Sequence, residues 1–125
     1  FLQKREENMA GLDYLLFRTG WSSLWEHEEY LRNFPVLSVE AAGWLAGKSL
    51  KGIGLDAISV DPVESDTWPV HHILFGAGMV LVENLLFPPG MKEGRYFFCA
   101  LPLRLLSADG SPVRAIAMTL PPGVD

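Results

Sequence analysis

Residues 69–85 restrict the fold more than any other part of the chain, because their pattern predicts a short helix, a glycine turn and a returning strand. Pro69 suits the first turn of a helix, where its missing N–H costs no hydrogen bond. Gly76 and Gly78 can end that helix by adopting positive φ. The apolar run 79–82 that follows is typical of a buried strand. The segment therefore predicts a helix and a strand that run in opposite directions.

This arrangement brings two distant polar side chains to one level. From His71 to residue 77 a helix rises roughly 9 Å at about 1.5 Å per residue. From residue 80 to Glu83 a strand returns roughly 10 Å at about 3.3 Å per residue. The two lengths nearly cancel, so we expect the side chains of His71 and Glu83 to converge, close enough for one metal ion or a water-bridged pair of metal ions.

Other interpretations of these two residues stay open at this point. A histidine at a helix start and a glutamate at a strand end are more often solvated than bound to a ligand. However, Glu83 and Asn84 lie between two apolar runs, and an unpaired buried charge is costly. The carboxylate is therefore expected at a strand edge, in an ion pair or on a metal.

Composition limits the classes of partner. The chain has 125 residues, enough for one domain with a core. Its net charge of -5 and its scattered Lys and Arg residues argue against nucleic acid as a partner. No apolar run is long enough to span a bilayer, so no membrane partner is expected. The single Cys99 excludes an internal disulfide and predicts a reducing, cytoplasmic location.

The remaining elements follow from apolar runs and helix caps. Strands are expected at 14–18, 50–56, 95–106 and 113–118, with a turn at 107–111. A helix is expected at 38–47, because Ser38 is a good N-cap and Gly47 can end the helix. Alternating strands and helices imply parallel pairing, whereas the last two strands form an antiparallel hairpin. The predicted fold class is α/β, a mixed sheet with flanking helices, and residues 1–125 form a single domain.

Three polar residues follow the second predicted strand. Asp56, Ser59 and Asp61 are best interpreted as a hydrogen-bonded turn, and less well as catalytic groups. The charged segment 25–33 is expected to be exposed. Gly52-Ile53-Gly54 lacks the third glycine and the following helix of a phosphate-binding loop.

Several sequence blocks together resemble a known family. They are LLFRTGW (15–21), GIGLDAISVDP (52–62), PVH (69–71) with ENL (83–85), and ALPL (100–103) with GSPVRA (110–115). In this order, they resemble the C-terminal part of the cyclase-like metal-dependent hydrolases, which include kynurenine formamidase and isatin hydrolase. Each block alone is weakly specific, but the set is specific. The resemblance implies a swivelling β/β/α fold.

The same resemblance implies a site and a chemistry. His71 and Glu83 match metal ligands of the family, which uses Zn or Mn to cleave amide, formamide or lactam C–N bonds. His72, turned by about 100° around the helix, should point away. The family's first metal-binding segment and its catalytic histidine would lie upstream, so the catalytic and substrate-binding residues are not identified here. The resemblance thus implies that residues 1–125 are the C-terminal part of such an enzyme.

The leading hypothesis is a metal-dependent amidohydrolase of the arylformamidase type that acts on a small-molecule amide. This chain alone is expected to be inactive. The alternative is a non-catalytic binding or interaction protein that keeps the fold without the metal site. Nitrogen and carboxylate ligands accept both Zn and Mn. Uncovered strand edges and the apolar runs 15–17 and 97–101 predict a homo-oligomer, most simply a dimer.

Overall fold

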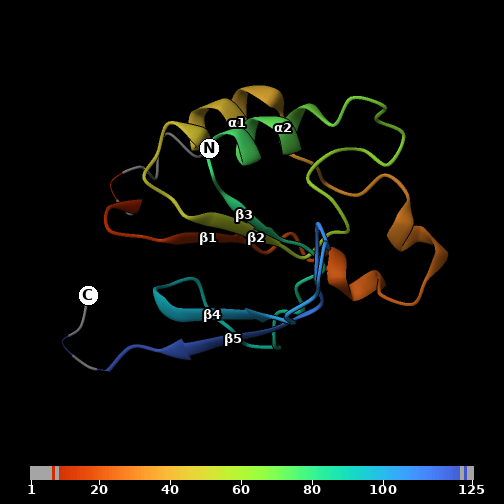
Figure 1. Cartoon of the computed structure of the whole chain (residues 1–125). Coiled ribbons are helices and arrows are strands. Elements are labelled where there is room, and N and C mark those ends of the chain that lie inside the picture. The colour runs from red at the N-terminus through yellow and green to blue at the C-terminus, as the bar shows by residue number, and fades with distance from the viewer. Residues whose placement is uncertain (1–6, 8, 122, 124–125) are drawn as a thin grey trace. The chain divides into compact units, whose positions relative to one another are not determined.

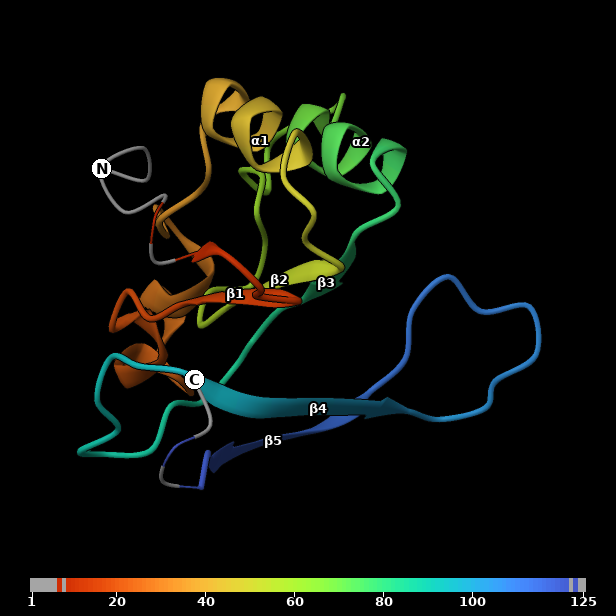
Figure 2. The same ribbon diagram turned by 90° about the vertical axis from the view of Figure 1, so that its left-hand side faces the viewer.

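The computed structural model describes residue 7, residues 9–121 and residue 123, and the chain divides into two compact units, Phe1–Phe87 and Pro88–Asp125. The first unit holds a parallel sheet of three strands in the order β1-β2-β3, with two helices on one face (Figures 1 and 2). Its elements are β1 (Tyr14–Phe17), α1 (Val39–Ala46), β2 (Gly52–Leu55), α2 (Pro69–Gly76) and β3 (Val80–Val82). The predicted alternation of strands and helices is therefore confirmed.

The second unit is an antiparallel hairpin. Its strands are β4 (Tyr96–Pro102) and β5 (Val113–Thr119). The backbone N–H of Leu103 donates to Ser111 Oγ over 2.9 Å, which links the two sides of the connection. The α/β class with parallel and antiparallel strands is confirmed, and the two kinds of strand form separate sheets, one in each unit.

The helix boundaries follow the caps that the sequence predicts. Ser38 Oγ accepts a hydrogen bond from the backbone N–H of Ala41 over 3.1 Å, and α1 ends at Gly47. Pro69 occupies the first turn of α2. The residue before it, Trp68, adopts a left-handed backbone conformation with φ 44° and ψ 50°, which is uncommon outside glycine.

The two glycines of β2 allow the three strands to pack closely. A Cβ atom on Gly52 would lie 2.4 Å from the carbonyl oxygen of Val80 and 2.6 Å from the ring of Tyr14. A Cβ atom on Gly54 would lie 2.7 Å from the side chains of Leu16 and Leu85. These glycines therefore serve sheet packing.

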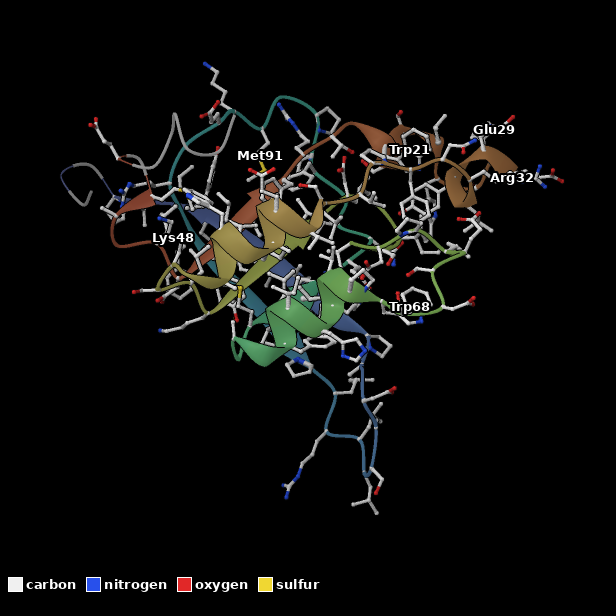
Figure 3. The ribbon with its side chains drawn as sticks, turned by 90° about the horizontal axis from the view of Figure 1, so that it is seen from above. Trp21, Glu29, Arg32, Lys48, Trp68 and Met91 are labelled. Carbon is white, nitrogen blue, oxygen red and sulfur yellow. The ribbon has the colours of Figure 1, made fainter. Side chains whose placement is uncertain are left out.

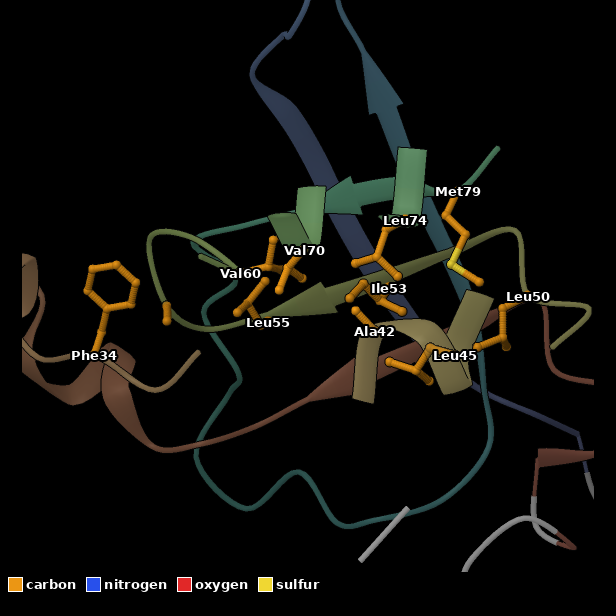
Figure 4. Close-up of a cluster of buried hydrophobic side chains, with 11 residues drawn as sticks. Phe34, Ala42, Leu45, Leu50, Ile53, Leu55, Val60, Val70, Leu74 and Met79 are labelled. Atoms are coloured by element: carbon orange, nitrogen blue, oxygen red, sulfur yellow. The ribbon is translucent and has the colours of Figure 1, made fainter. Parts of the chain in front are cut away.

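The hydrophobic core lies between the helices and the parallel sheet (Figure 4). Leu45 from α1, Ile53 from β2 and Leu74 from α2 are each fully buried. Burying a side chain of this size stabilises a fold by roughly 1.5–3 kcal/mol, so these contacts fix the helices on the sheet. Within the described part of the chain, no helix is long and apolar enough to cross a membrane.

Two short 3₁₀ helices follow β1. They are η2 (Trp21–Leu24) and η3 (Glu28–Leu31). The expectation that segment 25–33 is exposed is wrong for one residue: Tyr30 is only 4% exposed. Its hydroxyl and its backbone carbonyl both take part in hydrogen bonds with other segments of this unit.

Candidate metal centre

The polar residues of the site lie where the parallel strands end. Asp56 follows β2 directly, and Glu83 follows β3 directly. The segment after β1 joins them there, because the backbone N–H and the hydroxyl of Thr19 donate to Asp56 Oδ1 over 2.8 and 2.7 Å. In open α/β sheets, ligands bind at the carboxyl ends of the strands.

The structure brings His71 and Glu83 together at this edge. His71 lies in the first turn of α2, and its Nε2 atom is 3.5 Å from Glu83 Oε1. The same Oε1 atom accepts a hydrogen bond from the backbone N–H of Val60 over 3.2 Å. The His71 and Glu83 side chains are 20% and 27% exposed, so solvent reaches both. The two side chains converge because α2 and β3 run in opposite directions over nearly equal lengths, as the sequence predicts.

Asp61 contacts the same histidine from the other side. Its carboxylate is buried, and Oδ2 lies 2.7 Å from His71 Nδ1. The backbone N–H groups of Val70 and His71 donate to Oδ1 and Oδ2 over 3.0 and 2.9 Å. The interpretation of Asp61 as part of a local turn is thus incomplete, because its carboxylate reaches nine and ten residues ahead to the start of α2. Ser59 does form a local contact: its Oγ accepts from the backbone N–H of Asp61.

The two carboxylates have opposite pKa shifts. Burial raises the pKa of Glu83 above its ordinary value, and the neighbouring His71 and the Val60 amide only partly oppose this effect. Burial also acts to raise the pKa of Asp61, but the hydrogen bonds from His71 and Val70 outweigh it and lower that pKa. Of these two carboxylates, Glu83 is the one whose charged form its surroundings disfavour, and a nearby cation favours the charged form of such a group.

Aromatic rings flank the imidazole of His71. The rings of Trp68 and Phe75 each lie 5.6 Å from it, centroid to centroid, in edge-type contacts. Both rings are exposed, and Figure 3 shows Trp68 beside the start of α2. His72 is also exposed, and the side-chain contacts to Asp61 and Glu83 come from His71.

Tyr30 supports the same edge and was missed by sequence reasoning. Its hydroxyl donates to Asn84 Oδ1 over 2.8 Å, next to Glu83 in the chain. Burial and the nearby carboxylates of Asp56 and Glu83 raise the pKa of Tyr30, so its hydroxyl stays protonated and can donate. The backbone carbonyl of Tyr30 accepts from Trp21 Nε1 over 2.9 Å. The sequence signal for its burial was the presence of this aromatic residue within the charged segment 25–33.

The donor set of His71 and Glu83 fits a divalent metal. Imidazole nitrogen and carboxylate oxygen both bind zinc and manganese. Among the residues that the structure describes, no group of three His, Cys, Asp or Glu side chains is arranged to hold a metal ion. A catalytic zinc commonly has three protein ligands, so this pair alone would supply only part of a coordination shell.

Comparisons with known proteins place the chain among hydrolase sequences and structures. The Cyclase family model matches residues 1–62. A kynurenine formamidase of Bacillus cytotoxicus is 40% identical over 113 residues, covering 90% of this chain and 53% of that protein. The chain therefore spans about half the length of the curated relatives that it matches.

Solved structures show the same fold. A potential metal-dependent hydrolase with cyclase activity aligns with a TM-score of 0.71 and 35% identity, covering 84% of this chain and 50% of that one. Isatin hydrolase A from Ralstonia solanacearum aligns with a TM-score of 0.77 and 27% identity, covering 93% and 50%. The class of protein is an α/β protein that carries polar residues where the parallel strands of its sheet end. Within that class, the chain is related to the cyclase-like metal-dependent hydrolases, which confirms the resemblance.

Proposed function

We propose that this chain supplies part of the active site of a metal-dependent hydrolase that cleaves a C–N bond of a small amide, formamide or lactam. The observation that carries the proposal is the pair of His71 Nε2 and Glu83 Oε1, 3.5 Å apart at the carboxyl edge of the sheet. The similarity to kynurenine formamidases supports the reaction class. The alternative, a non-catalytic interaction protein, leaves this pairing without a role.

In this proposal His71 and Glu83 hold the metal, Zn or Mn. When bound, a divalent metal supplies Lewis acidity and activates water at neutral pH. The chain's own residues keep the two ligands in place. Val60 donates its backbone N–H to Glu83, and Tyr30 holds Asn84, the residue that follows it.

Two ligands leave most of the metal's coordination to other groups, so we propose that further ligands and the proton-transferring histidine come from elsewhere in the functional protein. The chain would then be its C-terminal part, located in the reducing cytoplasm. The 125-residue chain by itself is expected to bind metal weakly and to hydrolyse no amide, because partial coordination retains metal poorly. Robust turnover of N-formylkynurenine by the purified chain would contradict this expectation.

A hybrid enzyme tests the reaction directly. The matching 113 residues of the Bacillus cytotoxicus kynurenine formamidase would be replaced by the corresponding residues of this chain. We expect the purified hybrid to hydrolyse N-formylkynurenine when Zn or Mn is supplied. A hybrid that folds, as judged by circular dichroism and gel filtration, but remains inactive on formamide and lactam substrates would favour the interaction protein.

Self-association is a separate expectation. Large apolar side chains of the hairpin unit are exposed, among them Phe97, Leu101 and Ile116. Exposed apolar patches commonly mark interfaces, and an isolated two-stranded hairpin is marginally stable at best. We therefore expect a homo-oligomer, most simply a dimer, in light scattering at micromolar concentration. A monomer with a single cooperative melting transition would contradict this prediction.

A further inference from the structure

We propose that Asp61 is a positioning residue, which holds the imidazole of His71 in the Nδ1–H tautomer and leaves the Nε2 lone pair directed toward Glu83. The tautomer depends only on contacts within this chain. Its consequence for metal binding rests on the proposed function, and the experiment below separates the two.

The Asp61 carboxylate is held in a fixed orientation. The side chain is 1% exposed, and both of its oxygens accept hydrogen bonds from backbone amides at the start of α2. Val70 donates to Oδ1 and His71 donates to Oδ2. Rotation of the carboxylate away from these amides would leave the buried N–H of Val70 and the part-buried N–H of His71 without acceptors, and a buried group left unpaired costs roughly 1–3 kcal/mol.

The fixed carboxylate determines which ring nitrogen of His71 carries the proton. Asp61 Oδ2 already accepts from a backbone N–H, and it lies 2.7 Å from His71 Nδ1. An ionised carboxylate can only accept hydrogen bonds, so Nδ1 has to carry the proton. In a neutral imidazole the other nitrogen is then an acceptor.

The other ring nitrogen, Nε2, lies on the side of Glu83. Nε2 of His71 faces Glu83 Oε1 at 3.5 Å, which is longer than the roughly 2.7–2.9 Å of a charge-assisted hydrogen bond. Two lone-pair-bearing atoms at this separation suit a shared cation better than a shared proton. The rings of Trp68 and Phe75 restrict rotation of the imidazole, so the direction of Nε2 is maintained.

The substitution Asp61→Asn tests the proposal. Asparagine keeps only one acceptor oxygen, so its NH₂ group has to face either the backbone N–H of Val70 or the Nδ1 atom of His71. In the second orientation it donates to Nδ1 and favours the Nε2–H tautomer. The tautomers are read by long-range ¹⁵N–¹H NMR of the imidazoles in the full chain, at a pH well above the ordinary histidine pKa of about 6.5. His27 and His72, both exposed, serve as internal references.

The expected result is Nδ1–H alone for His71 in the wild-type chain and a detectable Nε2–H population in the variant. Zn²⁺ titration should then show roughly 10–100-fold weaker binding by the variant. Ser38→Ala is the matched control, because it removes a helix cap of α1 without touching His71. It should lower stability by about 1 kcal/mol and leave both the tautomer and the zinc affinity unchanged.

A wild-type His71 that carries its proton on Nε2 overturns the proposal, even if the variant does not fold. A folded Asp61→Ala chain in which His71 keeps the Nδ1–H tautomer also overturns it, because alanine leaves Nδ1 without this acceptor. If the tautomer changes as expected but the chain shows no measurable zinc binding, the role of Asp61 is upheld. That last result would instead count against the proposed metal function.

Discussion

Replacing His71 by phenylalanine, or Glu83 by glutamine, is expected to lower the formamidase activity of the hybrid enzyme by at least about 10³-fold. Each change removes one of the two proposed metal ligands, and the metal contributes several kcal/mol to the stability of the transition state. Phenylalanine keeps an aromatic ring between Trp68 and Phe75. Glutamine keeps an oxygen that can accept from Val60. A loss of activity would therefore reflect the loss of a metal ligand and not a change in packing. Steady-state kinetics with added Zn or Mn would measure this loss.

Two neighbouring substitutions control for general damage. His72→Phe changes the adjacent histidine, and Glu64→Gln changes an acid in the loop before α2; both residues are exposed. Each is expected to keep activity within about twofold of the hybrid, because surface changes away from a site usually cost less than about 0.5 kcal/mol. Equal losses for His71→Phe and His72→Phe would contradict the assignment.

Substituting alanine for Gly52 is expected to destabilise the first unit by about 3 kcal/mol or more, at the upper end of overpacking effects. The new Cβ would lie 2.4 Å from a backbone oxygen of Val80, which is paired with Gly52 in the sheet. A flexible side chain could move away from such a contact, but this backbone is held because Val80 N–H donates to the carbonyl of Lys51 over 2.9 Å. Urea denaturation followed by circular dichroism measures the change in free energy of unfolding.

Gly76→Ala is the matched control for that experiment. Gly76 is the last residue of α2, and a Cβ there would meet no atom within 4 Å. Alanine favours the helix over glycine by up to about 1 kcal/mol, so this variant should be as stable as the wild type or slightly more stable. A Gly52→Ala chain as stable as the Gly76→Ala chain would show that β2 and β3 are not packed as described.

Local signals in the sequence were sufficient for the first unit and for the central pair of the site. Ser38 and Pro69 mark the starts of α1 and α2 through capping chemistry that needs no tertiary contact. The convergence of His71 and Glu83 follows from element lengths, because a helix of two turns and a short strand nearly cancel. The resemblance to the cyclase-like hydrolases then pointed to metal binding at this pair.

Other parts of the site depend on contacts that local patterns do not encode. The Asp61 carboxylate looks like a turn residue in sequence, because its partners lie nine and ten positions ahead and depend on the path of the intervening loop. Tyr30 lies among charged residues, and its hydroxyl donates to Asn84, 54 positions away. The glycines of β2 show no phosphate-binding pattern, and their role in strand packing is apparent only from the distances to β1 and β3.

The measurement that most directly tests the central claim is a zinc titration of the 125-residue chain followed by ¹⁵N NMR of its three histidines. If His71 and Glu83 form a metal half-site, the Nε2 resonance of His71 should shift first, and Glu83→Gln should weaken that shift. His27 and His72 should respond only at higher zinc concentrations. A titration in which His71 stays unperturbed, or responds no earlier than His72, would contradict the assignment of this pair as metal ligands.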